Sequence, residues 1–191
     1  MQILLIRHGE PVAARTARPG MIVSGAECER LARGYAGSEI HPESHPPAWL
    51  VRRAGKAGIA YSSALRRAVQ SAELLGLGGR LTVDPVFDEA PIPYGYLTGL
   101  KLPVGVWAAL ARLLWLLDRS PGFEGISGTR ARARRCAAIL HDAAAGHGRA
   151  VLVAHGCINA LIRQSLMDTG WMPVSWYHQG YWAVNALTRS S

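Results

Sequence analysis

Two short apolar runs in this chain each end in a histidine that is followed directly by glycine. Residues 2–6 lead into Arg7-His8-Gly9, and residues 151–154 lead into His155-Gly156. A short apolar run that stops at a polar residue and a glycine is typical of a buried parallel strand meeting the loop at its carboxyl end. Ligands bind at that edge of open α/β sheets. The sequence therefore predicts one site that gathers two imidazoles and a guanidinium, a combination suited to holding and attacking a phosphoryl group.

The composition favours a single domain with an anionic ligand. The 191 residues are about one domain's worth, and an apolar content of 49% is enough for a sizeable core. The net charge of +8 favours acidic partners such as phosphorylated small molecules. No RNA-binding motif or helix-turn-helix signature accompanies this charge, so nucleic acid is not an expected partner, and we interpret the basic run at 130–135 as a solvated helix face.

Other classes of protein lack their usual signals here. The three cysteines are far apart and form no C-x-x-C pair, so neither a zinc site nor a disulfide framework is indicated. The histidines lack ligand spacing with carboxylates, so we expect no metal and no cofactor. We expect no leader before the first strand. The most apolar helical stretch, 104–117, is too short to cross a membrane. We expect a cytoplasmic protein without membrane association.

Strand and helix patterns alternate along the chain. We expect strands at 2–6, 59–63, 81–83, 151–154 and 181–187, with the last at an edge of the sheet. We expect helices at 26–33, 48–57, 64–75, 104–117, 129–145 and 158–167. This order predicts an α/β fold, a three-layer α/β/α sandwich whose mostly parallel central sheet has helices on both faces. One domain spans 1–191, with cap or insert segments near 11–47 and 91–120.

A further segment, residues 62–72, follows the second strand and opens a helix. Free N–H groups at a helix N-terminus, together with serine hydroxyls, make a site for an anion. Its two adjacent arginines, Arg66 and Arg67, leave two candidates for the guanidinium that points inward.

These motifs together resemble the histidine phosphatase superfamily, also called the phosphoglycerate mutase-like family. That family carries Arg-His-Gly at the first strand, a Ser-Ser-Pro-Leu-x-Arg-Ala-x-x-Thr-Ala segment, a later acidic residue and a strand-terminal His-Gly. The corresponding parts here are Arg7-His8-Gly9, residues 62–72, Glu89 and His155-Gly156. They occur in the family's order and span most of the chain.

The resemblance implies a role for each matched residue. His8 is the nucleophile that becomes phosphorylated, and Arg7, Arg67 and His155 clamp the phosphoryl oxygens. Arg67 is favoured over Arg66 because alanine follows it, as it follows the family's arginine. Fixed cations aimed at the equatorial oxygens of a transferring phosphoryl group lower the barrier to transfer. The phosphate-binding set is then Arg7, Gly9, Arg67, His155 and Gly156.

The proton donor is chosen among three carboxyl groups. A leaving alkoxide needs a proton and the phosphohistidine then needs an activated water, and one carboxyl group can serve both steps. The family places a glutamate after the third strand, which favours Glu89, followed by Asp88 and then Glu10.

Some positions depart from the family pattern. An asparagine that often joins the phosphate pocket is replaced by Ala14, and Arg15 is a candidate substitute. The proline of the second segment is Ala64. Trp107 and Trp115 fall in the expected cap region, where core packing or a dimer contact competes with a substrate contact.

We expect a phosphatase that hydrolyses a small phosphomonoester through a phosphohistidine intermediate. Two alternatives stay open: phosphoryl transfer of the phosphoglycerate mutase type, and a non-catalytic phosphate-binding member of the fold. The expected partner is a small phosphorylated substrate, and a homodimer stays open. In the aromatic C-terminal cluster, His178 is the one residue that we would test as a ligand contact.

Overall fold

A six-stranded sheet forms the centre of the computed structural model, which describes residues 1–16, 18–91, 99–120, 122–174 and 176–190. The strand order is β4-β3-β6-β1-β8-β7. The strands are β1 (Gln2–Arg7), β3 (Ile59–Ser62), β4 (Leu81–Val83), β6 (Arg149–Ala154), β7 (Met172–Pro173) and β8 (Val184–Thr188). Strands β4, β3, β6 and β1 run parallel to one another, whereas β8 is antiparallel to both β1 and β7.

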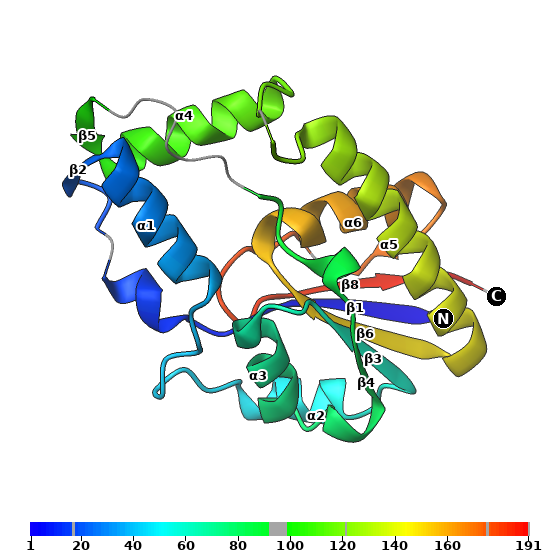
Figure 1. Ribbon diagram of the computed structural model, residues 1–191. Helices are drawn as coiled ribbons and strands as arrows, with labels where there is room; N and C mark the ends of the chain where they lie inside the picture. The colour runs from blue at the N-terminus through cyan, green and yellow to red at the C-terminus, as the bar shows by residue number, and fades with distance from the viewer. Residues whose placement is uncertain (17, 92–98, 121, 175, 191) are drawn as a thin grey trace.

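Helices cover both faces of this sheet (Figure 1). The helices are α1 (Gly25–Ala36), α2 (Ala48–Ala54), α3 (Arg66–Leu74), α4 (Val104–Leu116), α5 (Ile126–His147) and α6 (Gly156–Asp168), with 3-10 turns η1 (Val12–Arg15), η2 (Gly78–Arg80) and η3 (Pro85–Phe87). Helices α2 and α3 pack on one face, and α5 and α6 pack on the other. The predicted three-layer α/β/α fold is confirmed.

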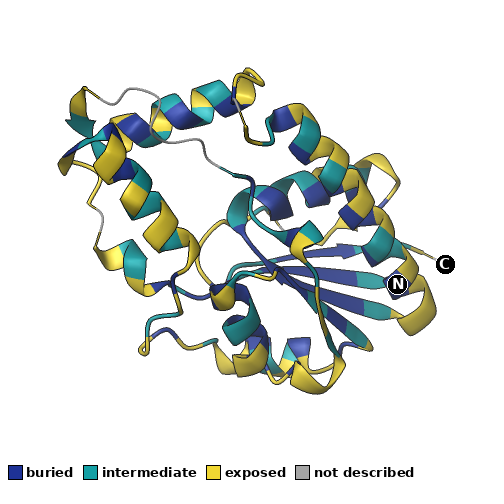
Figure 2. Cartoon of the chain, viewed as in Figure 1, coloured by how far each residue is buried: buried dark blue, intermediate teal, exposed yellow. Residues whose placement is uncertain are grey.

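The period-two geometry of β1 explains how one strand serves two cores. Ile3 and Leu5 belong to the core beneath α5 and α6, while Leu4 and Ile6 belong to the core beneath α2 and α3. All four are fully buried, which accounts for a continuous apolar run instead of an alternating one. Figure 2 shows the same burial along the central strands.

Strand register fixes the site at the carboxyl edge. In the parallel β1·β6 pair, Arg7 lies opposite Ala154, so His8 and His155 leave the sheet side by side. The N–H of His8 continues this ladder and donates to the carbonyl oxygen of Ala154 at 3.0 Å. On the other side of β6, Ser62 lies opposite Val153, which brings the following residue, Ser63, to the same edge.

A lobe built from two distant segments stands beside this edge (Figure 1). It consists of β2 (Ile22–Ser24), α1, β5 (Lys101–Pro103) and α4, and β2 pairs with β5 in an antiparallel ribbon. Val23, Cys28 and Trp107 form its small core. The segments predicted near 11–47 and 91–120 thus meet in the fold, although 92–98 lie outside the described residues.

The ends of several elements differ from prediction. The last strand was expected at an edge, which is wrong: β8 lies between β1 and β7. The edge strand on that side of the sheet is β7, which has two residues, too few to show a periodic pattern in the sequence. The helix expected from residue 64 begins at Arg66, because the hydroxyl of Ser63 is engaged with the Asp88 carboxylate at 2.6 Å.

Apolar residues at 107, 110, 114 and 117 recur at helical spacing and predict one buried stripe, but the buried face of α4 differs from it. Trp107, Ala111 and Trp115 are buried, whereas Leu117 is 56% exposed. Each indole N–H has an acceptor, the carbonyl oxygen of Val23 at 3.0 Å for Trp107 and the hydroxyl of Thr129 at 3.2 Å for Trp115. Burying two satisfied indoles outweighs burying leucine, so the helix turns this face inward. No helix in the described part of the chain is long and apolar enough to cross a membrane.

Candidate active site

His8 lies buried at the carboxyl end of β1, and its two ring nitrogens have different partners. Nδ1 is 2.6 Å from the carbonyl oxygen of Gly9, which can only accept, so Nδ1 carries the proton. Nε2 therefore carries the lone pair, and it accepts the Nε–H of Arg67 at 3.2 Å. This tautomer turns the nucleophilic nitrogen toward a guanidinium.

The surroundings keep this imidazole neutral. The pKa of His8 is lowered to about 3, chiefly by burial and also by the positive charges of Arg67 and Arg7, against the opposing hydrogen bond to Gly9. At neutral pH the ring is uncharged. A neutral imidazole nitrogen is a competent nucleophile for a phosphoryl group.

Of the two adjacent arginines, Arg67 is buried at the site and Arg66 is exposed. Besides contacting His8, Arg67 donates from Nη1 to the carbonyl oxygens of Tyr35 at 3.0 Å and Ala36 at 2.9 Å, at the end of α1. Arg66 instead forms an ion pair with Glu39 on the surface. Burial lowers the pKa of Arg67 from its ordinary value of 12.5, a starting point so high that the group stays cationic.

His155 meets His8 across the register of β1 and β6. The ring centroids are 4.9 Å apart, and His155 is fully buried. Its Nε2 lies 2.8 Å from the hydroxyl of Ser63, and its Nδ1 has no partner among the described residues. Burial, followed by the nearby His8, lowers the pKa of His155 well below its usual value, so this ring is also neutral.

Ser63 and Asp88 contact each other behind His155, an arrangement that the sequence did not predict. The hydroxyl of Ser63 donates to the Asp88 carboxylate at 2.6 Å, and the backbone N–H of Ala64 donates to the same oxygen at 2.8 Å. Asp88 is therefore connected to His155 through the hydroxyl of Ser63. The available signal was a serine directly after a buried strand that is adjacent to the strand carrying the second histidine.

Arg7 approaches the same edge from β1. Its guanidinium lies 4.6 Å from the ring centroid of Tyr181 and donates from Nη1 to the carbonyl oxygen of Gln179. Tyr181 itself lies 5.9 Å from the His8 ring, a neighbour that the sequence did not predict. Burial raises the pKa of Tyr181 to about 12, so its hydroxyl stays protonated.

The two predicted glycines allow close packing at the site. A Cβ at Gly9 would lie 2.5 Å from the Trp182 ring, so no side chain fits there. A Cβ at Gly156 would lie 3.7 Å from the guanidinium carbon of Arg7, an ordinary contact that would narrow the space beside it. Gly9 is thus required by packing, and Gly156 keeps the α6 N-terminus open.

The three candidate carboxylates have different surroundings. Glu89 accepts the backbone N–H groups of Cys157 at 3.2 Å and Ile158 at 3.0 Å, so it sits at the N-terminus of α6 beside the site. Glu10 is partly exposed and pairs with Arg15 at 2.9 Å, and this hydrogen bond lowers the pKa of Glu10.

Arg15, the candidate substitute for the missing asparagine, is engaged with two carboxylates. Its terminal nitrogens donate to Glu10 at 2.9 Å and to Glu43 at 3.1 Å, in an exposed network. Ala14 lies in η1 and has no polar side chain to offer. His178, also considered from the sequence, is exposed and uses its backbone to bind Asn185.

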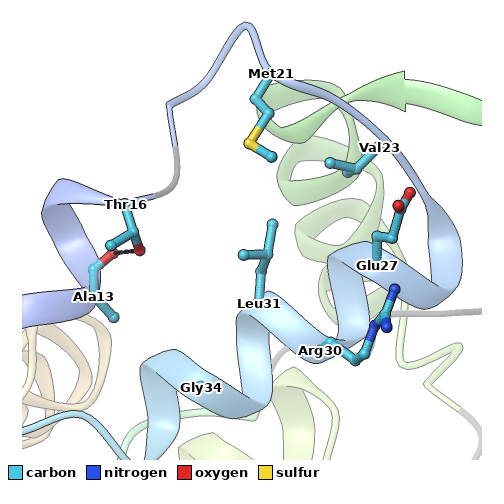
Figure 3. A pocket seen from close by; sticks show the side chains of 8 residues that line it. All are labelled: Ala13, Thr16, Met21, Val23, Glu27, Arg30, Leu31 and Gly34. Atoms are coloured by element: carbon cyan, nitrogen blue, oxygen red, sulfur yellow. Dashed lines mark hydrogen bonds between the residues drawn. The ribbon is translucent and has the colours of Figure 1, made fainter.

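A cavity of about 360 Å³ lies within the lobe, apart from the residues described above (Figure 3). It lies between η1, the chain leading into β2, and α1, and Leu31 projects into it. Its lining residues are Ala13, Thr16, Met21, Val23, Glu27, Arg30, Leu31 and Gly34. In the described residues, no group of three His, Cys, Asp or Glu side chains is arranged to hold a metal ion.

The sequence model of the histidine phosphatase superfamily (branch 1) matches residues 3–191. No curated protein sequence matches the chain. Among solved structures, a mycobacterial glucosyl-3-phosphoglycerate phosphatase in complex with VO3 is 23% identical, with a TM-score of 0.63 and coverage of 98% of this chain and 90% of that one.

Two further structures have the same fold. A protein described as mycobacterial hydrolase 1 is 22% identical, with a TM-score of 0.60 and coverage of 87% of this chain and 78% of that one. Phosphoserine phosphatase from Entamoeba histolytica, in complex with 3-phosphoglyceric acid, is 18% identical, with a TM-score of 0.56 and coverage of 97% and 89%. The match of the family's sequence model over nearly the whole chain shows that this protein belongs to the histidine phosphatase superfamily.

Proposed function

We propose that this protein is a phosphatase that hydrolyses a small phosphomonoester through a phosphohistidine intermediate on His8. The observation that carries the proposal is the tautomer of His8: Nδ1 is tied to the Gly9 carbonyl, which leaves the Nε2 lone pair facing the Arg67 guanidinium. A neutral nucleophile and a fixed cation at the same point are what phosphoryl transfer to nitrogen needs.

In the first step, His8 Nε2 attacks phosphorus and the ester P–O bond breaks. Negative charge on the equatorial oxygens is met by Arg67 and Arg7, which are held in place before the substrate arrives. The departing alkoxide takes a proton from a carboxyl group, for which we propose Glu89. The products are an alcohol and His8 phosphorylated on Nε2.

In the second step, water attacks the phosphohistidine and the P–N bond breaks. The Glu89 carboxylate takes the proton of that water, inorganic phosphate leaves, and both residues return to their starting states. Glu89 is preferred because it lies at the N-terminus of α6, directly after His155, and is bound there only by backbone N–H groups among the described contacts. Asp88 instead accepts the Ser63 hydroxyl, and Glu10 pairs with Arg15.

The net charge of +8 supports an anionic substrate. The names of the similar structures give the first compounds to assay. One is a glucosyl-3-phosphoglycerate phosphatase, and another is a phosphoserine phosphatase with bound 3-phosphoglyceric acid. The three compounds in these names are all small phosphorylated acids. We therefore propose phosphorylated carboxylic acids as the first panel, with vanadate as an inhibitor.

The test measures phosphate release from p-nitrophenyl phosphate and from this panel. Wild type should turn over, and His8→Ala should lose at least about 10³-fold in kcat/KM, because the nucleophile is gone. His147→Ala, at the far end of α5, is the matched histidine control and should stay within about twofold. Full activity in His8→Ala would refute the mechanism.

The same assay separates the two other possibilities. Exchange of phosphate between positions of a phosphoglycerate, with little free phosphate, would indicate a mutase. Phosphate binding without any turnover would indicate a non-catalytic member of the fold.

A further inference from the structure

The hydrogen-bond network behind His155 determines which of its ring nitrogens carries the proton. The Ser63 hydroxyl has one proton, and it goes to the Asp88 carboxylate at 2.6 Å, because a carboxylate can only accept. The hydroxyl oxygen is therefore an acceptor toward His155, so the ring donates from Nε2 at 2.8 Å. The other ring nitrogen, Nδ1, holds a lone pair.

That lone pair is buried without a partner. His155 is fully buried, and no described group donates to Nδ1. A buried acceptor without a donor keeps its full desolvation penalty, so it indicates a donor that arrives with the ligand. A fully ionised phosphate oxygen cannot be that donor, because it too can only accept.

We propose that the site binds a phosphate group together with one proton, which lies between a phosphate oxygen and Nδ1 of His155. The substrate is thus taken as the phosphomonoester monoanion, or as the dianion plus a proton, and these two descriptions are thermodynamically the same. The inference rests on the phosphate site of the proposed function, although it requires binding and not turnover.

The charges around His155 explain why this proton arrives only with the anion. Four charged or titratable groups act directly on the ring: Arg7 at the end of β1, His8 just after it, Arg67 of α3 and Arg132 of α5. Asp88 acts through the Ser63 hydroxyl. The surrounding arginines disfavour a charged imidazole in the empty site. The negative charge of bound phosphate offsets the charge of the arginines, so a proton that is unfavourable in the empty site becomes favourable in the complex.

Calorimetric titration with inorganic phosphate tests the proposal. At about pH 8.5, where free phosphate is mostly dianionic, the binding enthalpy measured in several buffers should show uptake of about one proton per phosphate. Affinity should fall about tenfold per pH unit in this range. Uptake near zero in wild type would overturn the proposal, whether or not the protein turns over any substrate.

Two variants locate the proton. His155→Gln keeps an amide donor for a dianionic oxygen, so phosphate should bind with uptake close to zero and weaker pH dependence. The control His147→Gln should keep the wild-type uptake. Unchanged uptake in His155→Gln would place the proton elsewhere and overturn the proposal.

The tautomer itself can be read by ¹⁵N NMR of the histidine rings, which keeps the test independent of any variant that fails to fold. Phosphate-free wild type should show His155 protonated on Nε2, and Ser63→Ala should lose this preference while Ser63→Thr restores it. Protonation on Nδ1 in wild type would contradict the network.

Discussion

The carboxyl edge of the sheet and the lobe beside it are held in place by very different means. At the edge, His8 and His155 follow paired residues of two buried parallel strands, so backbone hydrogen bonds fix their spacing. In the lobe, a three-residue ribbon and a small core around Trp107 join segments about 80 residues apart in sequence. The residues of the candidate site are thus placed by the sheet, while the lobe depends on a small set of contacts between distant segments.

Arg67 links the two regions, since it contacts both His8 and the last residues of α1. Arg67→Ala should lower kcat/KM by about 10²–10³-fold, the cost typical of removing a group that stabilises transition-state charge. Its neighbour provides the matched control: Arg66→Ala should stay within about twofold, because Arg66 is exposed and its ion pair with Glu39 is screened by solvent. Steady-state kinetics on both variants, with circular dichroism to confirm folding, checks this. Equal losses in the two would remove the distinction between a buried and a solvated arginine.

The lobe should be separable from the sheet in stability. Trp107→Ala removes the largest side chain of the lobe core and its hydrogen bond to Val23, a change that costs about 3–5 kcal/mol when such a residue is deleted from a core. Amide hydrogen exchange should accelerate in α1 and α4 and stay unchanged in β1 and β6. Acceleration spread evenly over the sheet would mean that the two regions form one cooperative unit.

The two buried histidines predict a pH dependence of stability. Both have lowered pKa values in the folded state, His8 to about 3, so below the ordinary value of 6.5 the unfolded chain binds protons that the native state does not. The free energy of unfolding therefore decreases as the pH is lowered, by about 1.4 kcal/mol per histidine between about pH 7.5 and 5.5.

Urea unfolding measures this difference. His8→Ala should lose about 1.4 kcal/mol less than wild type over the same pH interval, because one of the two groups is absent. The same loss in both proteins would show that His8 titrates normally in the native state.

The smallest effect is expected outside both regions. Arg15→Ala should change kcat/KM by less than about twofold and stability by less than about 1 kcal/mol, because its exposed ion pairs with Glu10 and Glu43 are screened by solvent. A loss of phosphate affinity above tenfold would instead give Arg15 the role of the asparagine that Ala14 replaces.

The sheet edge could be predicted from sequence and much of the lobe could not, for physical reasons. Buried parallel strands leave continuous apolar runs, so the meeting of His8 and His155 followed from two such runs and the rule that parallel strands end at one edge. The choice of Arg67 over Arg66 came from the resemblance, since both residues share one helix and no local signal separates them.

Other parts depend on contacts between distant segments. The β2–β5 ribbon has three residues in each strand, too few to show a period. The hydrogen-bond network from Asp88 through Ser63 to His155 depends on where the loop after η3 meets the end of β3, which no local pattern encodes. The inward face of α4 was mispredicted because counting apolar positions ignores which indoles find an acceptor.

The central claim is that His8 Nε2 forms a bond to phosphorus, and rapid quenching tests it most directly. Wild type mixed with ³²P-labelled p-nitrophenyl phosphate and stopped in alkali, where phosphohistidine survives, should carry label on His8 by mass spectrometry. Glu89→Gln should accumulate more of it, because this leaving group departs without a proton whereas hydrolysis of the phosphohistidine still needs the base. Steady turnover without labelled His8, together with full turnover in His8→Ala, would contradict the account.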